Sequence, residues 1–488
     1  MVASNPVTGD SRVQKVAWSA AAAGWDVVVV ATSPDGDRHD ERLGTGPAAA
    51  RVVRVPVPQR WAAAARRLAP PALPLAAAAD RAAAGVRRRL QVRATAPGSG
   101  GGAAGRLAWQ LATLRRTLPH QRDLERALLP EVVAARPVLV HAHDYTTLPL
   151  AVAAADALAD AGRRRPAVVY DAHEYLPGVQ APDPVWRTLL SAGERDGIAR
   201  ADAVVTVSEP LAELLQREHH LPRRPAVVEN APVAAPTDAP AGGAGAPDAG
   251  GVRGLREALG LEPDVPLLVY SGAVAPQRGL GTCVDALPEL PGVHLALVAA
   301  PGNRHVPGLL QRAADLGVGD RVHVHPYVPA AQVPSFLASA DVGLVPLLHH
   351  PNHELALITK YYEYLHARLP VVVSDVREMA RATRELGNGE VFPAGDAGAL
   401  AAAVRTVLAQ RDRYAAAYTP EVLAAHTWGP QAAVLLAEYE RLTGGPPPAP
   451  AGEPEAFADV RLVPGHGPGT PGPVVLRAPS TRGDRQRS

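Results

Sequence analysis

The sequence alternates short runs of β-branched residues with longer helical patterns along most of its 488 residues. Runs such as DVVVVA, AVVYDAH and LPVVVSD are apolar throughout rather than at every second position. Strands of this kind are buried on both faces, as parallel strands covered by helices are. The intervening segments, for example HVPGLLQRAADLG, are long enough for the right-handed crossovers that join parallel strands. The pattern predicts an α/β protein with two open, Rossmann-like, doubly wound parallel sheets.

The two sets of strands are separated by a segment without periodicity. Residues 236–251 are mainly proline, glycine and alanine, which predicts a flexible linker. We therefore expect an N-terminal domain over residues 1–235 and a C-terminal domain over residues 252–425. The hydrophobic share of 47% is sufficient for a core in each domain. Residues 444–488 contain few large apolar side chains, so we expect this tail to be disordered.

Composition and charge exclude several classes of function. A formal net charge of +1 gives no overall attraction to nucleic acid, so we expect no nucleic-acid partner. The single cysteine, Cys283, cannot form an internal disulfide. The first residues lack a signal-peptide pattern, and the apolar stretches are shorter than the roughly 18 residues of a spanning helix. These features predict a cytoplasmic protein that does not cross a membrane.

The even charge balance hides one strongly basic segment. Between Arg60 and Arg116 the sequence has eleven arginines and one acidic residue, Asp80. Tryptophans and leucines are interspersed with these arginines in helix-compatible runs, within a basic helical region over about residues 60–130. This pattern is typical of helices that lie on an anionic membrane surface, and it predicts peripheral association with the inner membrane face. The alternative is a set of solvated helices joined by a glycine-rich loop.

One strand of the C-terminal half leads into a candidate phosphate site. In YSGAVAPQRGL the strand ends near Gly272, and Arg278 directly precedes a glycine and a helix. Gly272 allows a ligand to approach the backbone, and Arg278 can bind phosphate oxygens through two hydrogen bonds. The alternative is an ordinary strand–turn–helix with an exposed arginine.

A second candidate lies around one of the only two lysines of the chain. Lys360 and Glu363 are spaced i, i+3 on a predicted helix and precede the buried strand LPVVV, while Ile358 and Thr359 come just before that helix. A carboxylate at a strand-edge crevice can accept both hydroxyls of a ribose, and the lysine can reach a phosphate. A surface ion pair is the alternative.

Polar side chains also follow two buried strands of the N-terminal half. His141, His143 and Asp144 belong to HAHD, and His173 and Glu174 belong to DAHE. At the carboxyl ends of strands these side chains can bind sugar hydroxyls or transfer protons. Capping of the strand ends is the alternative. Their spacing does not suit a zinc site, so we expect no metal.

Taken in order, these segments resemble the retaining glycosyltransferases of family 4, which have the GT-B fold. The resemblance covers roughly residues 1–443 and rests on NPVTGDSRVQKVAWSAAAAGWDVVVVA, VLVHAHD, VVYDAHE, ADAVVTVSEPLAELL, YSGAVAPQRGL, ASADVGLVPL and KYYEYLHARLPVVVSD. It implies an N-terminal domain that binds an acceptor and a C-terminal domain that binds a nucleotide-diphosphate sugar, facing each other across a cleft. It also implies a terminal helix over residues 426–443 that crosses back to the first domain.

The resemblance implies roles for individual residues. The expected donor contacts are Gly272, Arg278, Tyr327, Val328, Ile358, Thr359, Lys360 and Glu363. Among them, Arg278 matches the residue on the diphosphate and Glu363 matches the second glutamate of a Glu-x7-Glu motif, which binds the ribose. The residues expected on the acceptor side are Asp10, Arg12, His141, Asp144 and Glu174. The residues expected to support catalysis are Arg278, Lys360, and either His143 or His173 as the histidine that touches the donor sugar.

Two positions depart from the family pattern. Leu355 stands at the first glutamate of the motif, with Glu354 one residue out of register, and Ala273 stands where an arginine usually follows the turn glycine. Either Glu354 and Lys360 substitute for these two polar contacts, or the activity is reduced. No cofactor is expected, since the nucleotide-diphosphate sugar is itself the donor substrate. The resemblance also implies that no protein nucleophile is needed, because the leaving phosphate can itself take the proton of the acceptor.

The expected reaction is transfer of a sugar to an acceptor that is a glycan, a lipid-linked molecule or a cell-envelope precursor. A nucleotide-sugar 2-epimerase has a similar two-domain architecture and is one alternative. A noncatalytic sugar-nucleotide-binding partner subunit is the other, suggested by the residues at positions 273 and 355.

Overall fold

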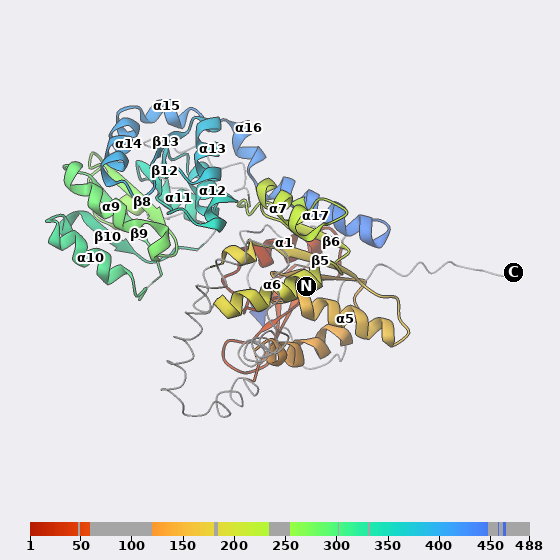
Figure 1. Ribbon diagram of the computed structural model, residues 1–488. Coiled ribbons are helices and arrows are strands. Elements are labelled where there is room, and N and C mark those ends of the chain that lie inside the picture. The colour runs from red at the N-terminus through yellow and green to blue at the C-terminus, as the bar shows by residue number, and fades with distance from the viewer. Residues whose placement is uncertain are drawn as a thin grey trace, which may run out of the picture.

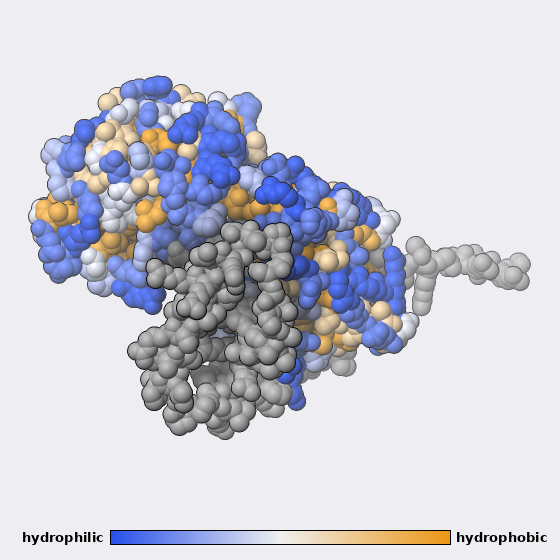
Figure 2. Space-filling view, viewed as in Figure 1, coloured by the Kyte–Doolittle hydropathy of each residue, from blue (hydrophilic) through white to orange (hydrophobic). Residues whose placement is uncertain are grey.

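The computed structural model describes residues 1–46, 49–58, 120–179, 184–233, 254–300, 302–329, 332–447, 457 and 462–464. Most of the basic segment predicted over residues 60–130, and the whole linker predicted over residues 236–251, lie outside these described residues. Figure 1 shows the described strands gathered into an N-terminal and a C-terminal domain. The face of the C-terminal domain seen in Figure 2 is mainly hydrophilic, with small scattered apolar patches. No helix in the described part of the chain combines the length and apolar character needed to span a bilayer.

The C-terminal domain contains a six-stranded sheet in which every strand is parallel to its neighbours. In spatial order its strands are β10 (Val322–His325), β9 (His294–Val298), β8 (Leu267–Ser271), β11 (Val342–Val345), β12 (Val371–Ser374) and β13 (Gly389–Phe392). The central strands β8, β11 and β12 are buried along their whole length. The parallel, doubly covered sheet predicted from continuous apolar runs is confirmed in this half.

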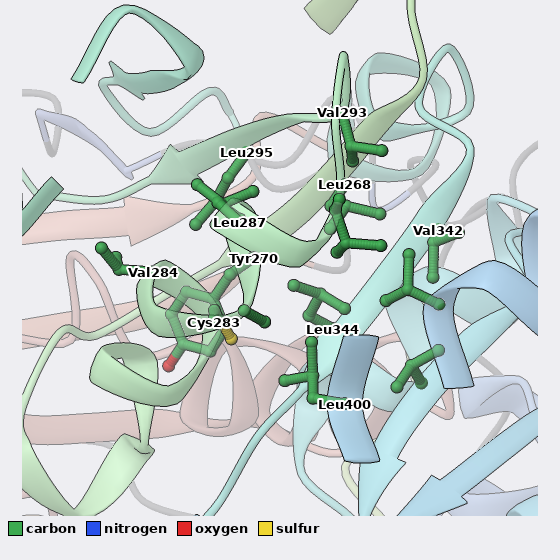
Figure 3. Packing of buried hydrophobic residues seen from close by; sticks show 14 of the residues in the cluster. Leu268, Tyr270, Cys283, Val284, Leu287, Val293, Leu295, Val342, Leu344 and Leu400 are labelled. Carbon is green, nitrogen blue, oxygen red and sulfur yellow. The ribbon is translucent and has the colours of Figure 1, made fainter. Parts of the chain in front are cut away.

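Helices cover both faces of this sheet. On one face lie α9 (Leu280–Ala286), α10 (Val306–Asp315) and α14 (Ala397–Ala409), and on the other lie α11 (Val333–Leu337), α12 (Thr359–His366) and α13 (Arg377–Leu386). Figure 3 shows Tyr270, Cys283 and Leu400 in the buried cluster of the first face. Tyr364 and Met379 belong to the cluster of the second face. The remaining helices and 3-10 turns of this half are α8 (Leu255–Ala258), η2 (Pro276–Arg278), η3 (Leu287–Glu289), η4 (Gly319–Arg321), η6 (Pro351–Glu354), α15 (Arg411–Ala415) and α16 (Pro420–Ala425).

The N-terminal domain is built on two four-stranded sheets. The first has the order β1 (Val28–Thr32), β3 (Ala50–Val55), β2 (His39–Leu43), β14 (Leu462–Pro464), and the second has the order β4 (Leu139–His143), β5 (Ala167–Ala172), β6 (Ala203–Thr206), β7 (Ala226–Val227). Val2 forms parallel bridges to Val30 and to Ala142, so the chain start joins the two sheets. The helices of this half are α1 (Ser11–Ala22), a helix over residues 120–134, α5 (Leu148–Asp160), η1 (Leu176–Gly178), α6 (Pro184–Ile198) and α7 (Glu209–His219).

Two details at the edge of this domain differ from the expected pattern. The strand β2 runs antiparallel to β3, so the sheet is not parallel throughout. The tail predicted to be disordered over residues 444–488 contains β14, which pairs antiparallel with β2. The ring of Phe457, also in this tail, lies 5.4 Å from that of Trp18, centroid to centroid. A three-residue strand is too short to produce a periodic pattern, which is why the sequence gives no signal for it.

The last long helix belongs to the N-terminal domain in space. The helix α17 (Trp428–Thr443) follows α16 of the C-terminal domain but contacts α1, β4 and β7 (Figure 1). The indole nitrogen of Trp428 donates to Ser19 Oγ at 2.7 Å, and the hydroxyl of Tyr439 lies 2.8 Å from His141 Nδ1. Both contacts are buried, so the end of the chain is fixed against the first domain.

Deletion of residues 448–488 tests the pairing of β14 with β2. Because β2 then becomes an edge strand without hydrogen-bond partners on one side, we expect amide exchange within His39–Leu43 to accelerate. An increase of about tenfold corresponds to a loss of about 1.4 kcal/mol in the opening free energy. Hydrogen–deuterium exchange with mass spectrometry measures this rate, and β8 serves as the internal control. Unchanged exchange in β2 would contradict the pairing.

Candidate active site

A cleft of about 890 Å3 lies between the two domains. Residues of the N-terminal domain that line it come from the loop over residues 5–12 and from the ends of β5 and β6. Residues of the C-terminal domain that line it are Arg278, which follows β8, and a segment over residues 352–360, which follows β11. The carboxyl ends of parallel strands from both domains therefore border one cleft, which is where ligands bind in open α/β sheets.

On the C-terminal side, Lys360 lies directly against the backbone of Gly272. A β-carbon built on Gly272 would come 1.7 Å from Lys360 Cε and 1.9 Å from Lys360 Nζ, so no other residue fits there without moving the lysine. Gly272 also has a φ of +130°, which side-chain-bearing residues rarely adopt. The Lys360 ammonium lies 5.8 Å from the centroid of the Tyr270 ring. Gly272 thus allows a long cationic side chain to cross the end of β8.

Arg278 is set by a tight turn at the end of the same strand. It ends the 3-10 turn η2 and precedes Gly279, whose φ is +70°. A β-carbon on Gly279 would lie 1.8 Å from the carbonyl oxygen of Pro346, so the turn packs directly on the backbone after β11. Arg278 is half-buried and lines the cleft. Its guanidinium forms no ion pair with the carboxylates of the described residues, which leaves its charge available to a ligand.

The two cations and Glu363 influence one another. The pKa of Lys360 is lowered to about 8, mainly by burial; Glu363 opposes this shift and Arg278 adds to it. Burial raises the pKa of Glu363, whereas Lys360 and Lys15 lower it. Arg278 and Lys360 both line the cleft, whereas Glu363, one turn further along α12, is not among the lining residues. Lys15, which the sequence analysis did not single out, also acts on Glu363.

The other predicted donor contacts fall into two groups. Ile358 and Thr359 line the cleft beside Lys360, and Thr359 Oγ1 accepts a hydrogen bond from Asn230 of the N-terminal domain at 3.1 Å. Tyr327 and Val328 are not among the residues that line the cleft. Tyr327 is 47% exposed, whereas Val328 packs on the cluster beneath α11 and α12.

A buried carboxylate organises the N-terminal side. Arg12 donates from Nε and Nη2 to the two oxygens of Asp171 at 2.9 and 2.7 Å, and from Nη1 to the Val228 carbonyl at 2.8 Å. The expected acceptor-facing role of Arg12 is not supported, because its guanidinium is occupied and 4% exposed. His141 is completely buried between Asp171 and Tyr439, so its predicted contact with an acceptor is wrong.

The structure separates the two histidines proposed for the donor sugar. His173 lines the cleft, with Nε2 3.3 Å from Asp171 Oδ2. Burial opposes protonation of His173, but Asp171 outweighs it and raises the pKa. His143 is 2% exposed, and burial together with His141 lowers its pKa well below the usual value. The structure therefore favours His173 over His143 as a ligand-facing group.

The remaining predicted acceptor-side residues differ in exposure to the cleft. Asp10 and Glu174 line it, and Asp10 also caps α1 by accepting from the Val13 amide at 3.1 Å. Burial and Asp144 raise the pKa of Glu174 to about 7, against the effects of His173 and Arg278. Asp144 is not among the residues that line the cleft, and its backbone has a strained φ of +69°.

His141, His143 and Asp171 place possible ligand atoms within 4.8 Å of one another. This set does not fit a resident metal, because the guanidinium of Arg12 already occupies both oxygens of Asp171. A cation there would face an adjacent positive charge in a buried setting, which is unfavourable.

The segment before α12 also corrects an expectation. The carboxylate of Glu354 binds His349 Nδ1 and the Arg377 amide, both at 2.7 Å, so it does not replace the missing motif glutamate in the cleft. Leu355 packs on the core of the N-terminal domain, and its carbonyl accepts from Ser208 Oγ at 2.5 Å. A polar donor contact of the family pattern is thus replaced by an apolar contact between the domains.

Two family profiles match consecutive parts of the chain. The profile described as "Glycosyltransferase Family 4" matches residues 77–231, and the one described as "Glycosyl transferases group 1" matches residues 265–410. A D-inositol 3-phosphate glycosyltransferase from Xylanimonas cellulosilytica is 30% identical over 281 residues, which is 55% of this chain and 62% of that protein. A GDP-mannose-dependent alpha-(1-6)-phosphatidylinositol monomannoside mannosyltransferase from Mycolicibacterium smegmatis is 35% identical over 105 residues, 21% of this chain and 27% of that protein. The chain thus spans less than two thirds of the length of these relatives.

Solved structures agree on the architecture. Sucrose-phosphate synthase from Thermosynechococcus elongatus superposes with a TM-score of 0.61 at 17% identity, covering 89% of this chain and 93% of that one. An E. coli structure titled trehalose-6-phosphate bound with UDP-2-fluoro glucose gives a TM-score of 0.55 at 15% identity, covering 91% and 98%. Two Rossmann-like domains bordering a common cleft define the GT-B class of fold. Glycosyltransferase family models match both halves in order, so the chain resembles the glycosyltransferases of family 4.

The contact between Gly272 and Lys360 can be tested by a double-mutant cycle. Gly272→Ala should reduce the free energy of unfolding by about 2–3 kcal/mol, because overpacking adds to backbone strain. Lys360→Ala in the same chain should recover the overpacking part, because it removes the colliding stem. Gly162→Ala is the matched control, since its φ is +71° but no atom lies within 4 Å of the added carbon. Equal losses for the two glycine variants in denaturant titrations, without recovery in the double variant, would contradict the contact.

Proposed function

We propose that this protein is a retaining glycosyltransferase that moves a sugar from a nucleotide-diphosphate sugar to a hydroxyl group of an acceptor. The observation that carries the proposal is the pair of cations near the end of β8, Arg278 and Lys360, which both line the cleft, with the stem of Lys360 lying against the backbone of Gly272. A diphosphate is the ligand that such a pair fits best, because its charge is spread over oxygens that both cations can reach.

The chemistry needs stabilisation of the charge on the departing nucleotide diphosphate. Fixed cations in a partly buried cleft do this with little reorganisation, and such preorganised groups often make the largest contribution to catalysis. Arg278 and Lys360 take this role. Burial lowers the pKa of His173, but Asp171 and Asp144 raise it overall, and from the opposite wall its ring can donate a hydrogen bond to the donor sugar or its phosphate.

The acceptor side of the proposal rests on the other wall of the cleft. Asp10 and Glu174 offer carboxylate oxygens that can accept hydrogen bonds from acceptor hydroxyls. The phosphate oxygen released from the donor takes the proton of the attacking hydroxyl, so no protein base is required. Relatives named for D-inositol 3-phosphate and for a phosphatidylinositol mannoside favour a cyclitol or glycolipid acceptor, including lipid-linked precursors of the cell envelope.

A donor screen tests the proposal directly. UDP- and GDP-sugars are incubated with the protein, with and without inositol phosphates or phosphatidylinositol glycolipids, and release of nucleotide diphosphate is measured. A transferase releases the diphosphate at a rate that depends on the acceptor, and its product keeps the anomeric configuration of the donor. Conversion of the donor without any acceptor would favour the 2-epimerase, and tight donor binding without turnover would favour a noncatalytic subunit.

Arg278→Ala should lower kcat by about 10²-fold or more, in line with loss of a charge-stabilising donor. The fold should remain intact, because Arg278 forms no ion pair with the described carboxylates and lies in a crevice rather than a core. Arg163→Ala removes an exposed arginine of the N-terminal domain and serves as the control for net charge. A near-native kcat of Arg278→Ala, together with an unchanged melting temperature, would contradict the assignment of the donor site.

The pKa of Lys360, about 8, predicts how activity changes with pH. Lys360 carries its charge below this value and loses it as the pH rises, so kcat/KM should fall about tenfold per pH unit on the alkaline side. Lys360→Arg keeps its charge throughout, because a guanidinium is not deprotonated in proteins. In this variant the decrease of kcat/KM on the alkaline side should therefore begin at a pH at least about one unit higher, even if the absolute rate is lower. If the alkaline decrease of kcat/KM occurs at the same pH in both proteins, a group other than Lys360 causes it.

A further inference from the structure

The chain passes between the two domains twice, and both passages contact one residue of α1. Lys15 is 3% exposed, and its ammonium donates to Asn230 Oδ1 at 2.7 Å and to the Ala231 carbonyl at 2.6 Å, where the first passage begins. It also lies 4.7 Å from the centroid of the Trp428 ring, where the second passage ends. The two passages are joined by the Trp428 amide, which donates to the Pro232 carbonyl at 2.7 Å.

The same lysine is connected to the donor helix α12. Asn230, whose side-chain oxygen accepts from Lys15, donates from Nδ2 to Thr359 Oγ1 at 3.1 Å. Glu363, on the next turn of α12, attracts the Lys15 ammonium across the domain boundary. The only two lysines of the chain, Lys15 and Lys360, therefore act on the same carboxylate from opposite domains.

The free-energy cost of burying the Lys15 ammonium favours one relative position of the two domains. A buried ammonium is unfavourable unless hydrogen bonds and an opposite charge compensate it. The pKa of Lys15 is lowered to about 7, mainly by burial and also by Arg12, whereas Glu363 and Asp10 act to raise it. Because Glu363 belongs to the C-terminal domain, part of the compensation is present only while α12 stays close to α1.

We propose that Lys15 is a positioning residue that couples the N-terminal domain to α12 and so holds Thr359 and Glu363 in place at the donor side of the cleft. The coupling follows from the two hydrogen bonds of Lys15, the Asn230–Thr359 bond and the proximity of Glu363. Its consequence for nucleotide binding rests on the proposed function, whereas its effect on the arrangement of the domains does not.

The arrangement of the domains is measured with two spin labels and electron–electron distance spectroscopy. Arg217→Cys on α7 and Ala314→Cys on α10 place labels at exposed positions of the two domains, and the native Cys283 is buried. We expect Lys15→Met to broaden the distance distribution markedly relative to the labelled parent. Asn230→Ala, which removes the link to Thr359 but keeps Lys15, should broaden it in the same direction. If either Lys15→Met or Asn230→Ala folds poorly, the distance distribution of the other variant still tests the proposal.

Arg321→Met is the matched control. Arg321 also binds backbone carbonyls, those of Leu287, Leu290 and Val293, but all of them lie within the C-terminal domain. It should lower the melting temperature without changing the distance distribution. Distributions of Lys15→Met and Asn230→Ala that match the parent would overturn the proposal, as would equal broadening by Arg321→Met.

Nucleotide binding gives the second readout, with UDP and GDP as probes in isothermal titration. Lys15→Met should weaken binding of the preferred diphosphate by about tenfold, the factor that corresponds to about 1.4 kcal/mol. Lys15→Arg keeps a cation and should restore most of the affinity, a rescue that a purely steric role would not give. If Lys15→Met binds the diphosphate with unchanged affinity, Lys15 stabilises only the contact between the domains, and its proposed role at the donor side is refuted. If neither probe binds the parent protein, the proposed function fails, and the distance measurement still decides the coupling.

Discussion

The donor side of the cleft depends on how closely α12 approaches the end of β8. The ring of Tyr364 on α12 lies over Gly343 of β11, where a β-carbon would come 2.7 Å from the ring. The hydroxyl of Tyr364 accepts from the Ser271 amide at 3.0 Å, which ties the helix to the last residue of β8. This seating brings the stem of Lys360 across Gly272. Two glycines and one buried tyrosine thus fix the position of a cation that the sequence alone only suggests.

The opposite wall is organised by charge rather than by close packing. Asp171 is completely buried, and Arg12 compensates its charge through two hydrogen bonds. The same carboxylate lies within 3.5 Å of His141, His143 and His173, of which His173 alone lines the cleft. This buried carboxylate therefore raises the pKa of the histidine that lines the cleft, against the effect of burial. The strength of this effect comes from exclusion of water, because electrostatic interactions are larger in a buried setting.

Much of the architecture follows from local patterns, but several contacts do not. Continuous apolar runs predict buried parallel strands, and polar residues at strand ends predict that Arg278 and Lys360 share one edge. His141 and His143 are two residues apart and lie on the same face of β4, so local sequence does not tell them apart. The structural role of His141 becomes visible only from its contact with the Tyr439 hydroxyl, 298 residues away. The contacts of Lys15 with residues 215 and 216 positions away leave no local signal either. Sequence patterns report periodicity and chain order, whereas these contacts depend on how distant elements pack.

A structure of the protein with a bound nucleotide diphosphate tests the central claim most directly, because the claim concerns where the diphosphate binds. The account predicts that the diphosphate lies in the cleft, with its oxygens about 2.7–3.2 Å from the guanidinium of Arg278 and the ammonium of Lys360. The ribose is predicted on the side of Glu363. A diphosphate bound outside the cleft, or inside it without contact to either cation, would contradict the account.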